Sequence, residues 1–316
     1  MRPSVAVVGA GMTGLSCARR LADAGCRVQV FDKGRGLGGR LATRRIDEAL
    51  SFDHGVQFVT ARGAGFAALL HELERRGVAA RWRPRQAGPA AGASGWWVGR
   101  PGMSRLVRPL AEGLDVHVAA RVVALEDTPG GWRLRAEAGA LHGPFDRLVL
   151  ALPPLQAAAL LDGRGLAASL SAVDVAPCWA VLLAFSAPLP APFDVWRAAE
   201  GRLAFAARNA SKPGRLALPE AWVLHAGADW SAAHLEAAPE DVVAALSAAF
   251  AEIAGPLPES LHASAHRWRY ARTLRPFGRP FLAGERLHVG GDWCLGAHVE
   301  AAYDSGTAIA EDLLEG

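Results

Sequence analysis

Three glycines near the N-terminus have the spacing of a loop that binds a phosphate group. They are Gly9, Gly11 and Gly14, and they follow a short apolar run at residues 5–8. Between a strand and a helix, the first glycine permits the turn, the second lets a pyrophosphate approach the backbone, and the third allows close packing of helix on strand. The helix N-terminus adds free N–H groups and a partial positive charge. We therefore predict a nucleotide site here in preference to a chance glycine turn.

A carboxylate and a second glycine cluster extend this site. Asp32 ends the next apolar run, about 20 residues further on, where a carboxylate can accept hydrogen bonds from ribose hydroxyls. Residues 34–40 have the sequence Gly-Arg-Gly-Leu-Gly-Gly-Arg, which can wrap around the same pyrophosphate. This second cluster favours FAD over NAD. The alternative for residues 34–40 is an arginine-rich solvated loop.

Residues near the C-terminus are predicted to close over the cofactor. Gly291 and Asp292 follow a short apolar run and precede a helix. Asp292 can accept a hydrogen bond from a ribitol hydroxyl, and the helix N-terminus can offer N–H groups to the flavin carbonyls. The alternative is a surface turn before a terminal helix. The residues predicted to contact FAD are Gly9, Ala10, Gly11, Met12, Thr13, Gly14, Asp32, Lys33, Gly39, Arg40, Gly55, Val56, Gln57, Val123, Gly291, Asp292, Val299, Glu300 and Ala302.

The elements that must position these residues follow from hydrophobic periodicity and turn signals. Strands are predicted at residues 4–8, 27–31, 96–98, 116–118, 122–126, 132–137, 145–152, 178–185, 203–207, 222–226, 261–270 and 287–289. Helices are predicted at residues 12–24, 65–76, 102–112, from 153 onward, 240–253 and 300–314, and residues 83–95 are predicted to form a loop. The first strand, helix and strand form a β-α-β unit around the glycine loop.

The chain is expected to begin in a nucleotide-binding lobe, leave it and return to it at the end. We predict an α/β fold with a discontinuous Rossmann-like FAD-binding domain at residues 1–62, 100–155 and 280–316. Residues 63–99 and 156–279 are predicted to form a second, α+β substrate domain with a mixed sheet. The length of 316 residues is sufficient for two such lobes.

The composition limits the possible partners. Apolar residues make up 51% of the chain, but no uncharged apolar run reaches the roughly 18–20 residues that span a bilayer. The net charge is +3, the arginines are spread out, and the four cysteines are scattered without metal-binding spacing. We expect a soluble, cytoplasmic protein that binds no nucleic acid, membrane or metal. The oligomeric state is not predicted.

Several motifs resemble those of the renalase family, especially its bacterial form. This family lies in the amine-oxidase-like branch of the glutathione-reductase-type flavoproteins. The motifs are residues 31–40, 53–62, 97–104, 207–213, 266–271 and 291–294, and they occur in the expected order. The resemblance implies non-covalent FAD and oxidation of aberrant dihydronicotinamide dinucleotides, which are isomers of NAD(P)H reduced at the wrong ring carbon. Oxygen would take the electrons and give hydrogen peroxide.

The resemblance also implies where the substrate lies. Residues 57–62 and the pair Trp96 and Trp97 would form the substrate-facing wall, although Val59 departs from the aromatic residue typical of relatives. Only one G-x-G-x-x-G follows a strand, so a nicotinamide donor must enter the substrate cleft directly. The residues predicted to bind the substrate are Gln57, Phe58, Thr60, Arg62, Trp96, Trp97, Asn209, His225 and Arg267.

Roles can be suggested for some of these side chains. Arg62 and Arg267 would hold phosphates or the carboxamide, and Thr60, Asn209 and His225 would offer hydrogen bonds. The alternatives are structural pairing of the arginines and a core histidine that donates to a backbone carbonyl. No catalytic residue is assigned.

An amine oxidase is the main competing hypothesis. Such enzymes commonly place a lysine near the flavin and two aromatic residues, often tyrosines, around the amine. This chain has two lysines, Lys33 in the cofactor loop and Lys212, and its tyrosines are Tyr270 and Tyr303. Hydride transfer from a dihydropyridine requires no base, because the donor gains aromaticity. A non-redox flavoprotein is a third possibility, and Cys294 raises the question of a covalent flavin link.

Overall fold

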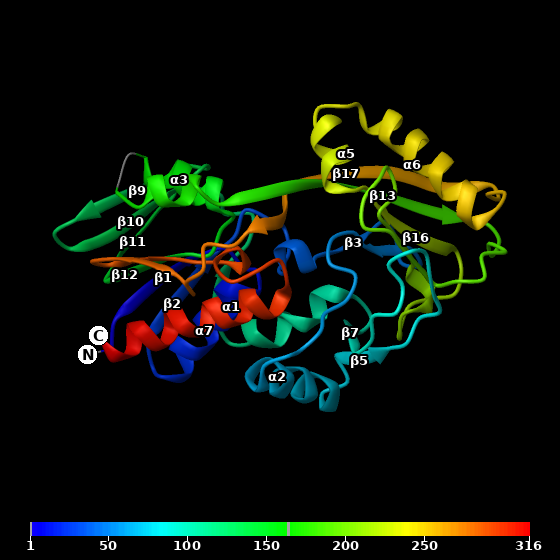
Figure 1. The fold of residues 1–316 in the computed structure, drawn as a ribbon. Coiled ribbons are helices and arrows are strands. Elements are labelled where there is room, and N and C mark those ends of the chain that lie inside the picture. Colours follow the sequence, from blue (N-terminus) through cyan, green and yellow to red (C-terminus); the bar gives the residue numbers. More distant parts are fainter. Residues whose placement is uncertain (1, 163–164) are drawn as a thin grey trace. The chain divides into compact units, whose positions relative to one another are not determined.

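The computed structural model describes residues 2–162 and 165–316. The chain divides into two compact units (Figure 1). Unit 1 comprises residues 1–39, 107–175 and 273–316, and unit 2 comprises residues 40–106 and 176–272. The chain therefore leaves unit 1 twice and returns to it twice.

A largely parallel sheet forms the centre of unit 1. Its strand order is β18 (Leu282–Gly284), β19 (Leu287–Val289), β12 (Arg147–Leu150), β1 (Ser4–Val8), β2 (Arg27–Phe31) and β8 (Asp115–His117). Strand β1 pairs in parallel with β2 and with β12, and β12 pairs in parallel with β19. The carboxyl ends of these strands therefore lie at one edge of the sheet, where Rossmann-like folds bind dinucleotides. Gly9, Asp32 and Gly290 directly follow β1, β2 and β19.

Helices and a three-stranded sheet surround this parallel sheet. The other elements of unit 1 are α1 (Met12–Asp23), η3 (Arg108–Ala111), β9 (Val122–Thr128), β10 (Gly131–Ala136), β11 (Leu141–Phe145), α3 (Pro154–Leu161), α4 (Ala167–Ser171), η5 (Asp292–Cys294) and α7 (Val299–Glu315). Strands β9, β10 and β11 form an antiparallel meander. Its residues Trp132 and Phe145 share one hydrophobic core with Phe31 and Leu148 of the parallel sheet.

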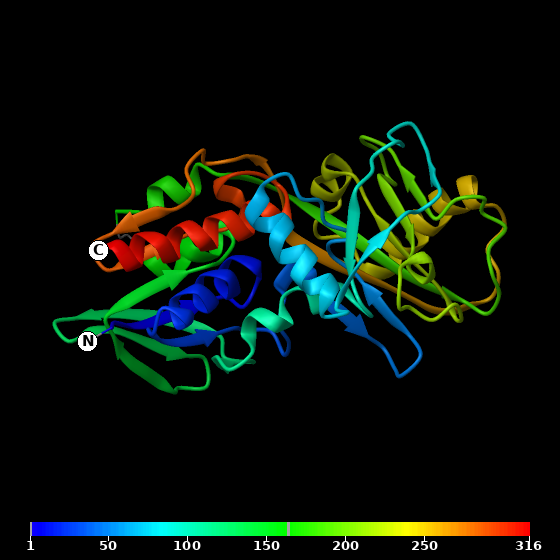
Figure 2. The same cartoon turned by 90° about the horizontal axis from the view of Figure 1, so that it is seen from below.

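Helices α1 and α7 lie side by side, although they come from opposite ends of the chain (Figure 1 and Figure 2). Their close approach depends on Gly306, because a Cβ atom at that position would overlap Thr13 O and Ser16 Oγ. The C-terminal helix is thereby packed against the helix that begins at the glycine loop.

Unit 2 is built on an antiparallel-rich sheet. Its strand order is β17 (Ser260–Arg275), β13 (Asp174–Phe185), β16 (Glu220–His225), β15 (Phe205–Arg208), β14 (Val195–Arg197) and β6 (Gln86–Ala87). Helices α5 (Ala228–Ala233) and α6 (Pro239–Ala254) cover one face (Figure 1). Val181 and Leu183 of β13 point to that face and share a core with Leu246 and Phe250 of α6.

The opposite face of this sheet carries a small hairpin. Leu182 and Ala184, which alternate with the residues that face α6, share a core with Leu50 and Phe52 of the hairpin. The remaining elements of this part of the chain are η1 (Gly39–Leu41), β3 (Thr43–Arg45), β4 (Ser51–Asp53), α2 (Ala64–Arg75), β5 (Ala79–Trp82), β7 (Trp96–Gly99), η2 (Met103–Leu106) and η4 (Asn209–Ser211). The hairpin β3–β4 thus places Asp53 at the end of a strand held by the sheet.

The predicted α/β fold class is confirmed, and some element predictions were wrong. The predicted helix at residues 102–112 is two 3-10 turns, η2 and η3, because Pro109 has no N–H to continue an α-helix. The predicted strand at residues 145–152 is the end of β11 followed by β12. The predicted loop at residues 83–95 contains the short strand β6. The elements β3, β4, β5, β14, α4 and α5 were not predicted.

The predicted domain boundaries differ from the two compact units. The prediction placed residues 40–62 and 100–106 with the FAD-binding domain, whereas the units place them in unit 2. The reason is the hairpin β3–β4, whose Leu50 and Phe52 pack on the unit 2 sheet. Residues 156–175 and 273–279 are correspondingly part of unit 1.

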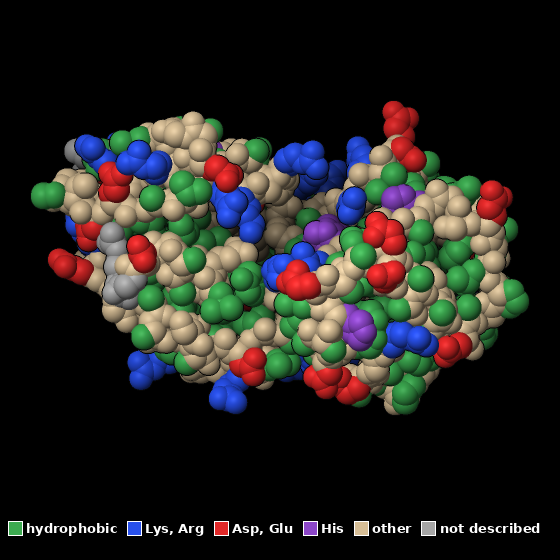
Figure 3. All heavy atoms as spheres, turned by 90° about the horizontal axis from the view of Figure 1, so that it is seen from above, with side chains coloured by type: hydrophobic (Ala, Val, Ile, Leu, Met, Phe, Trp, Pro, Cys, Tyr) green, Lys and Arg blue, Asp and Glu red, His purple; other side chains and the backbone are tan. Residues whose placement is uncertain are grey.

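The surface carries both signs of charge. Basic and acidic side chains are interspersed on the face drawn in Figure 3, in keeping with a net charge of +3. Among the described residues, no helix combines the length and the apolar character that crossing a bilayer requires.

The crossing of α1 and α7 gives a stability prediction. Substituting Gly306→Ala forces a Cβ atom into Thr13 O, so we expect a loss of about 1–3 kcal/mol in the free energy of unfolding. The matched control is Gly65→Ala, at an exposed position of helix α2, where alanine should be neutral or stabilise by up to about 1 kcal/mol. Denaturant unfolding of both variants measures the difference. Equal stability of Gly306→Ala and the wild type would contradict the close crossing.

Candidate functional site

The three glycines of the N-terminal loop are required for different physical reasons. Gly9 has φ +113°, and a Cβ atom there would overlap Ala151 O; a Cβ atom at Gly14 would overlap Gly9 O. Gly11 has an extended backbone with φ −84°, which any residue can adopt, and a Cβ atom there would meet nothing within 4 Å. The protein itself therefore needs Gly9 and Gly14, whereas the open space at Gly11 fits a ligand that approaches the backbone.

Asp32 joins the glycine loop to the second glycine cluster. Its Oδ2 accepts from Ala10 N at 2.6 Å, and its Oδ1 accepts from Gly34 N at 2.6 Å. Each carboxylate oxygen has a further lone pair. Asp32 can therefore shape both loops and still accept a hydrogen bond from a ribose hydroxyl.

The second glycine cluster lies against the first. Gly38 N donates to Ala10 O at 2.9 Å. A Cβ atom at Gly39 would lie 3.8 Å from Gly11 Cα. Both clusters therefore border the open space at Gly11, as expected for two loops that wrap one pyrophosphate.

The predicted closing segment is anchored to α7. Gly291 N donates to Ser305 Oγ at 3.1 Å, and a Cβ atom at Gly290 would lie 2.6 Å from the same oxygen. Asp292 and Glu300 are buried, with exposed fractions of 6% and 4%. Helix α7 begins at Val299, one residue before the predicted start, and its first turn is capped by His298 Nδ1, which accepts from Ala301 N at 3.0 Å.

The remaining predicted cofactor residues have varied surroundings. Lys33 is exposed and donates to Gln156 at 3.1 Å, and Val123 on β9 is 43% exposed. Arg40, Gly55, Val56 and Gln57 belong to unit 2. There Val56 N donates to Arg40 O at 2.9 Å, and Arg40 Nη1 donates to Ala271 O at 3.1 Å. Their contact with FAD stays a prediction.

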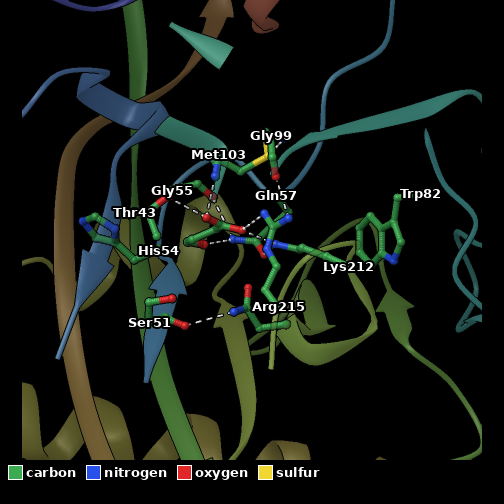
Figure 4. A network of polar contacts seen from close by, with 12 residues as sticks. Thr43, Ser51, His54, Gly55, Gln57, Trp82, Gly99, Met103, Lys212 and Arg215 are labelled. Atoms are coloured by element: carbon green, nitrogen blue, oxygen red, sulfur yellow. Dashed lines mark hydrogen bonds and ion pairs between the residues drawn. The ribbon is translucent and has the colours of Figure 1, made fainter. Parts of the chain in front are cut away.

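Unit 2 contains a buried charge cluster centred on Asp53, whose partners Lys212 and Arg215 are labelled in Figure 4. The Asp53 side chain is 0% exposed, and Lys212 is 1% exposed. Oδ2 of Asp53 accepts from Lys212 Nζ at 3.1 Å and from Arg215 Nη2 at 2.6 Å. Oδ1 accepts from Thr43 Oγ1 at 2.9 Å and from Met103 N at 2.8 Å. One buried carboxylate thus receives four hydrogen bonds, two of them from cations.

These partners shift the ionisation of the cluster. Burial alone would raise the pKa of Asp53, but Lys212, Arg215 and the Met103 N–H hold it well below its usual range. Burial lowers the pKa of Lys212 to about 8; Asp53 opposes this shift and Arg215 adds to it. Asp53 is therefore ionised, and Lys212 can release its proton under mildly alkaline conditions.

Gln57 is bound at both ends of its amide. Its Nε2 donates to Asp53 O and, at 3.0 Å, to Gly55 O. Its Oε1 accepts from Lys212 Nζ at 2.9 Å. Gln57 is 5% exposed. Both polar atoms of its amide are therefore engaged in hydrogen bonds within unit 2.

Aromatic rings form a second feature of unit 2. Phe58 stacks on Trp96 with ring centroids 3.8 Å apart and an interplanar angle of 8°. The Phe205 ring centroid lies 6.3 Å from that of Phe58 and 5.9 Å from that of His225. Trp96 and Trp97 are 1% and 2% exposed. Trp96 Nε1 is buried and finds no hydrogen-bond partner in the described residues.

The other predicted substrate residues are only partly brought together. Asn209 Nδ2 donates to Ser51 O at 2.9 Å, while its Oδ1 is buried and unsatisfied within the described residues. His225 Nε2 lies 3.4 Å from His54 O, the backbone contact considered as its alternative role. Thr60 is half-buried and Arg62 is exposed.

Arg267 has a structural partner. Its Nη1 donates to Leu235 O and Glu236 Oε2, both at 2.6 Å, and its guanidinium lies 5.6 Å from the Trp179 ring centroid. This matches the alternative of a paired arginine. Its contact with a substrate phosphate stays a prediction, and Arg267 would have to exchange partners to make it.

The sequence reasoning missed Asp53, Arg215 and Thr43, and it considered Lys212 only as an isolated lysine. Asp53 lies within the motif at residues 53–62, and Lys212 lies within the motif at residues 207–213. A lysine inside a motif of a chain with two lysines was an available signal. The pairing itself was not, because Asp53 and Lys212 are 159 positions apart.

Comparison with known families is now informative. A family model for a NAD(P)-binding Rossmann-like domain matches residues 7–73. A second model, for flavin-containing amine oxidoreductases, matches residues 84–314. The chain belongs to the flavin-containing amine oxidoreductase family. Membership of this family, together with the glycine loop, identifies FAD as the cofactor of this chain.

Solved structures share the fold. A proposed protoporphyrinogen oxidase from Exiguobacterium sp. 255-15 has a TM-score of 0.79 at 13% identity, and each chain is covered in full. Cyclohexylamine oxidase from Brevibacterium oxydans IH-35A has a TM-score of 0.76 at 12% identity, over 100% of this chain and 99% of the other. Putrescine oxidase with bound putrescine has a TM-score of 0.71 at 16% identity, over the whole of both chains. These identities support the fold alone.

One curated relative shares a short segment. A 4,4'-diapophytoene desaturase from Staphylococcus haemolyticus is 46% identical over 55 residues, which is 17% of this chain. The match spans only 11% of the length of the desaturase.

The open space at Gly11 gives a prediction about cofactor binding. Gly11→Ala should fold with the stability of the wild-type apoprotein, because the added methyl group meets no protein atom. It should lose FAD affinity by about tenfold or more, since the methyl group would occupy the approach to the pyrophosphate. Gly14→Ala is the contrasting variant and should lose stability as well. Thermal unfolding and FAD titration of the apoproteins measure both effects; unchanged FAD affinity of Gly11→Ala would refute this position of the pyrophosphate.

Two histidines give a prediction about pH. Burial, then His266 and Arg44, lowers the pKa of His54 to about 4, and burial lowers the pKa of His225 to about 4. The unfolded chain therefore binds more protons than the folded one between about pH 4 and 6.5, so stability falls as the pH drops through this window. For His54, which is 7% exposed, the loss is on the order of 2 kcal/mol at pH 5.

The measurement is thermal unfolding at about pH 7.5 and about pH 5. His54→Gln should show a smaller loss of stability on acidification than the wild type. Exposed His234→Gln is the control and should keep the wild-type pH dependence. The prediction fails if His54→Gln and His234→Gln respond alike.

Proposed function

We propose that this chain is a renalase-family, FAD-dependent oxidase of dihydronicotinamide dinucleotides reduced at the wrong ring carbon. The products would be NAD(P)+ and hydrogen peroxide, and the partners would be the dinucleotide substrate and O2. The proposal combines the family motifs with the charge and aromatic character of unit 2.

The observation that carries the proposal is the pairing of the buried carboxylates of unit 2. In the described part of this unit they are Asp53, Asp194 and Glu220, and each has a cationic partner. The Asp53 cluster contains two cations for one anion, which leaves a positive excess. Such surroundings favour an anionic dinucleotide over a cationic amine, because a buried ammonium group needs a carboxylate of its own.

The stacked pair Phe58 and Trp96 supports a planar ring as the substrate. Aromatic faces pack readily against flat rings, and the two rings are already aligned within 8°. Thr60, Arg62, Asn209 and His225 are proposed to contact the carboxamide or phosphates. The role of these residues would be to position the dihydropyridine and exclude water, since loss of hydride from this ring needs no general base.

Gly9, Gly11, Gly14, Asp32, Asp292 and Glu300 are the residues of unit 1 that we propose to hold FAD. Bound there, FAD would supply the hydride acceptor and the route by which two electrons reach O2, which gives hydrogen peroxide with one further proton from solvent. Burial raises the pKa of Cys294 to about 12, so its thiol stays protonated and is a poor nucleophile. This supports non-covalent binding of FAD.

An amine oxidase is the second candidate. The family description and the shared fold with putrescine oxidase and cyclohexylamine oxidase favour it. Against it, the two tyrosines lie in different units, Tyr270 in unit 2 and Tyr303 in unit 1, so neither unit can form a two-tyrosine cage alone. Lys212 is also occupied by Asp53 and Gln57.

Anaerobic mixing of the holoenzyme with candidate donors tests the proposal. Isomeric dihydro-NAD(P) should bleach the flavin absorbance near about 450 nm, and readmitted oxygen should restore it with one hydrogen peroxide per substrate. Ordinary NADH, putrescine and cyclohexylamine are the comparison donors and should react at least about tenfold more slowly.

Rapid bleaching by an amine instead would promote the second candidate. Slow reduction by every donor, without peroxide, would reject both and point to a non-redox use of the flavin.

A further inference from the structure

Residues 54–58, which follow β4 and which we call the Gln57 turn, are held by one backbone hydrogen bond, from Val56 N to Arg40 O at 2.9 Å, and by side chains. His54 O accepts from Trp268 Nε1 at 3.1 Å. Gly55 O and the preceding Asp53 O accept from Gln57 Nε2. Because backbone carbonyls are acceptors, the Gln57 amide must direct its NH2 group toward them. Its oxygen is then left for a donor from another segment.

Lys212 is that donor. Its Nζ lies 2.9 Å from Gln57 Oε1, and Figure 4 shows the two side chains pointing toward each other. The Lys212 side chain is 0% exposed and passes near Trp82, with Nζ 5.5 Å from the ring centroid. Water therefore does not compete for this hydrogen bond, and a buried amide oxygen without its donor would carry an uncompensated desolvation cost.

Loss of the Lys212 amine would leave Asp53 with three donors, whereas it would leave the Gln57 side-chain oxygen without the donor described above. Without Lys212, Asp53 keeps one cation, Arg215 at 2.6 Å, and two neutral donors, Thr43 and Met103. Its charge is still balanced one to one. The two-to-one excess of cations in the cluster therefore shows that charge balance does not require Lys212.

Arg215 has a different and wider set of contacts. Besides Asp53, its Nη1 donates to Gly99 O at 2.5 Å and to Pro213 O at 2.8 Å. It connects β7, the loop after η4 and β4. Removing Arg215 should disturb unit 2 broadly, whereas removing the amine of Lys212 should affect one amide.

We propose that Lys212 is a positioning residue that orients the Gln57 amide and thereby fixes the Gln57 turn. Its importance for turnover rests on the proposed function, in which Gln57 and Phe58 of this turn belong to the substrate wall. Lys212 contacts neither reacting atoms nor cofactor in this role. It acts through Gln57 alone.

The test is a double-mutant cycle on the holoenzyme with Lys212→Met, Gln57→Met and the double variant. Methionine keeps the apolar stem of each side chain and removes its polar end. Amide hydrogen exchange of the peptide that contains the Gln57 turn is the first readout, and KM and kcat for the dihydronicotinamide substrate are the second. Ser211→Ala, which alters η4 beside Lys212 without touching Gln57, is the control.

Lys212→Met should speed exchange of the turn peptide about tenfold, the effect of losing one buried hydrogen bond. KM should rise by a similar factor, because displacement of Gln57 and Phe58 weakens substrate binding. The change in kcat should be less than about threefold, because these residues take no part in the hydride transfer itself. Gln57→Met should reproduce both changes. The double variant should be no worse than either single variant, because both remove the same interaction. Ser211→Ala removes the acceptor of Trp82 Nε1 but leaves the Lys212–Gln57 hydrogen bond in place, so it should leave exchange of the turn peptide at the wild-type rate.

Other outcomes overturn the proposal. Additive effects in the double variant would show that Lys212 acts independently of Gln57. Faster exchange throughout unit 2, or failure of Lys212→Met to fold, would show that Asp53 needs both cations. If no dihydronicotinamide is oxidised, the proposed function fails, but the exchange readout still decides the role of Lys212.

Discussion

The charge of Asp53 is the constraint around which unit 2 is organised. A carboxylate that is 0% exposed would carry a desolvation cost of several kcal/mol without partners. Here four donors from three segments supply that compensation: Thr43 on β3, Met103 on η2, and Lys212 and Arg215 after η4. The hairpin β3–β4 could therefore not be held elsewhere on the sheet without leaving this charge unpaired. Lys212, one of these four donors, also donates to Gln57 Oε1 at 2.9 Å.

In unit 1 the packing is determined by close backbone contacts at glycines and not by a buried charge. Its backbone approaches itself at Gly9, Gly14 and Gly306, where a side chain would overlap a carbonyl oxygen. These contacts fix the helix α1 against the strand β1 and against the helix α7. The cofactor loop is thus supported from both sides by packing that needs no ligand. Of the three glycines of the N-terminal loop, Gly11 alone has open space at its Cβ position, and that space is where we expect the pyrophosphate of a dinucleotide to lie.

Local patterns predicted much of unit 1 and little of the polar cluster in unit 2. The glycine loop, α1, α7 and the meander turn at Gly131 each depend on neighbouring residues, so periodicity and turn chemistry were sufficient. Strands β3 and β4 have three residues each, too few for a periodic signal, and their place on the sheet depends on distant Leu182 and Val223. Likewise Lys212 was visible as a rare residue, but its partner Asp53 is brought to it only by tertiary packing. From the sequence Arg267 could not be distinguished from a ligand-binding arginine. Its partner Glu236 is 31 positions away, so no local spacing predicts the ion pair.

The packing of α7 on α1 also bears on how the protein is made. Unit 1 draws β1 and α1 from the beginning of the chain, β12 from the middle, and β19 and α7 from the end. During synthesis the glycine loop therefore emerges before α7, and α1 lacks this one packing partner until Val299–Glu315 has been translated. Unit 2, whose last strand β17 precedes α7, can be complete before unit 1 is. A FAD site that uses residues of both the glycine loop and α7 would thus be complete only after α7 has been translated, and ribosome-bound intermediates would carry an incomplete unit 1.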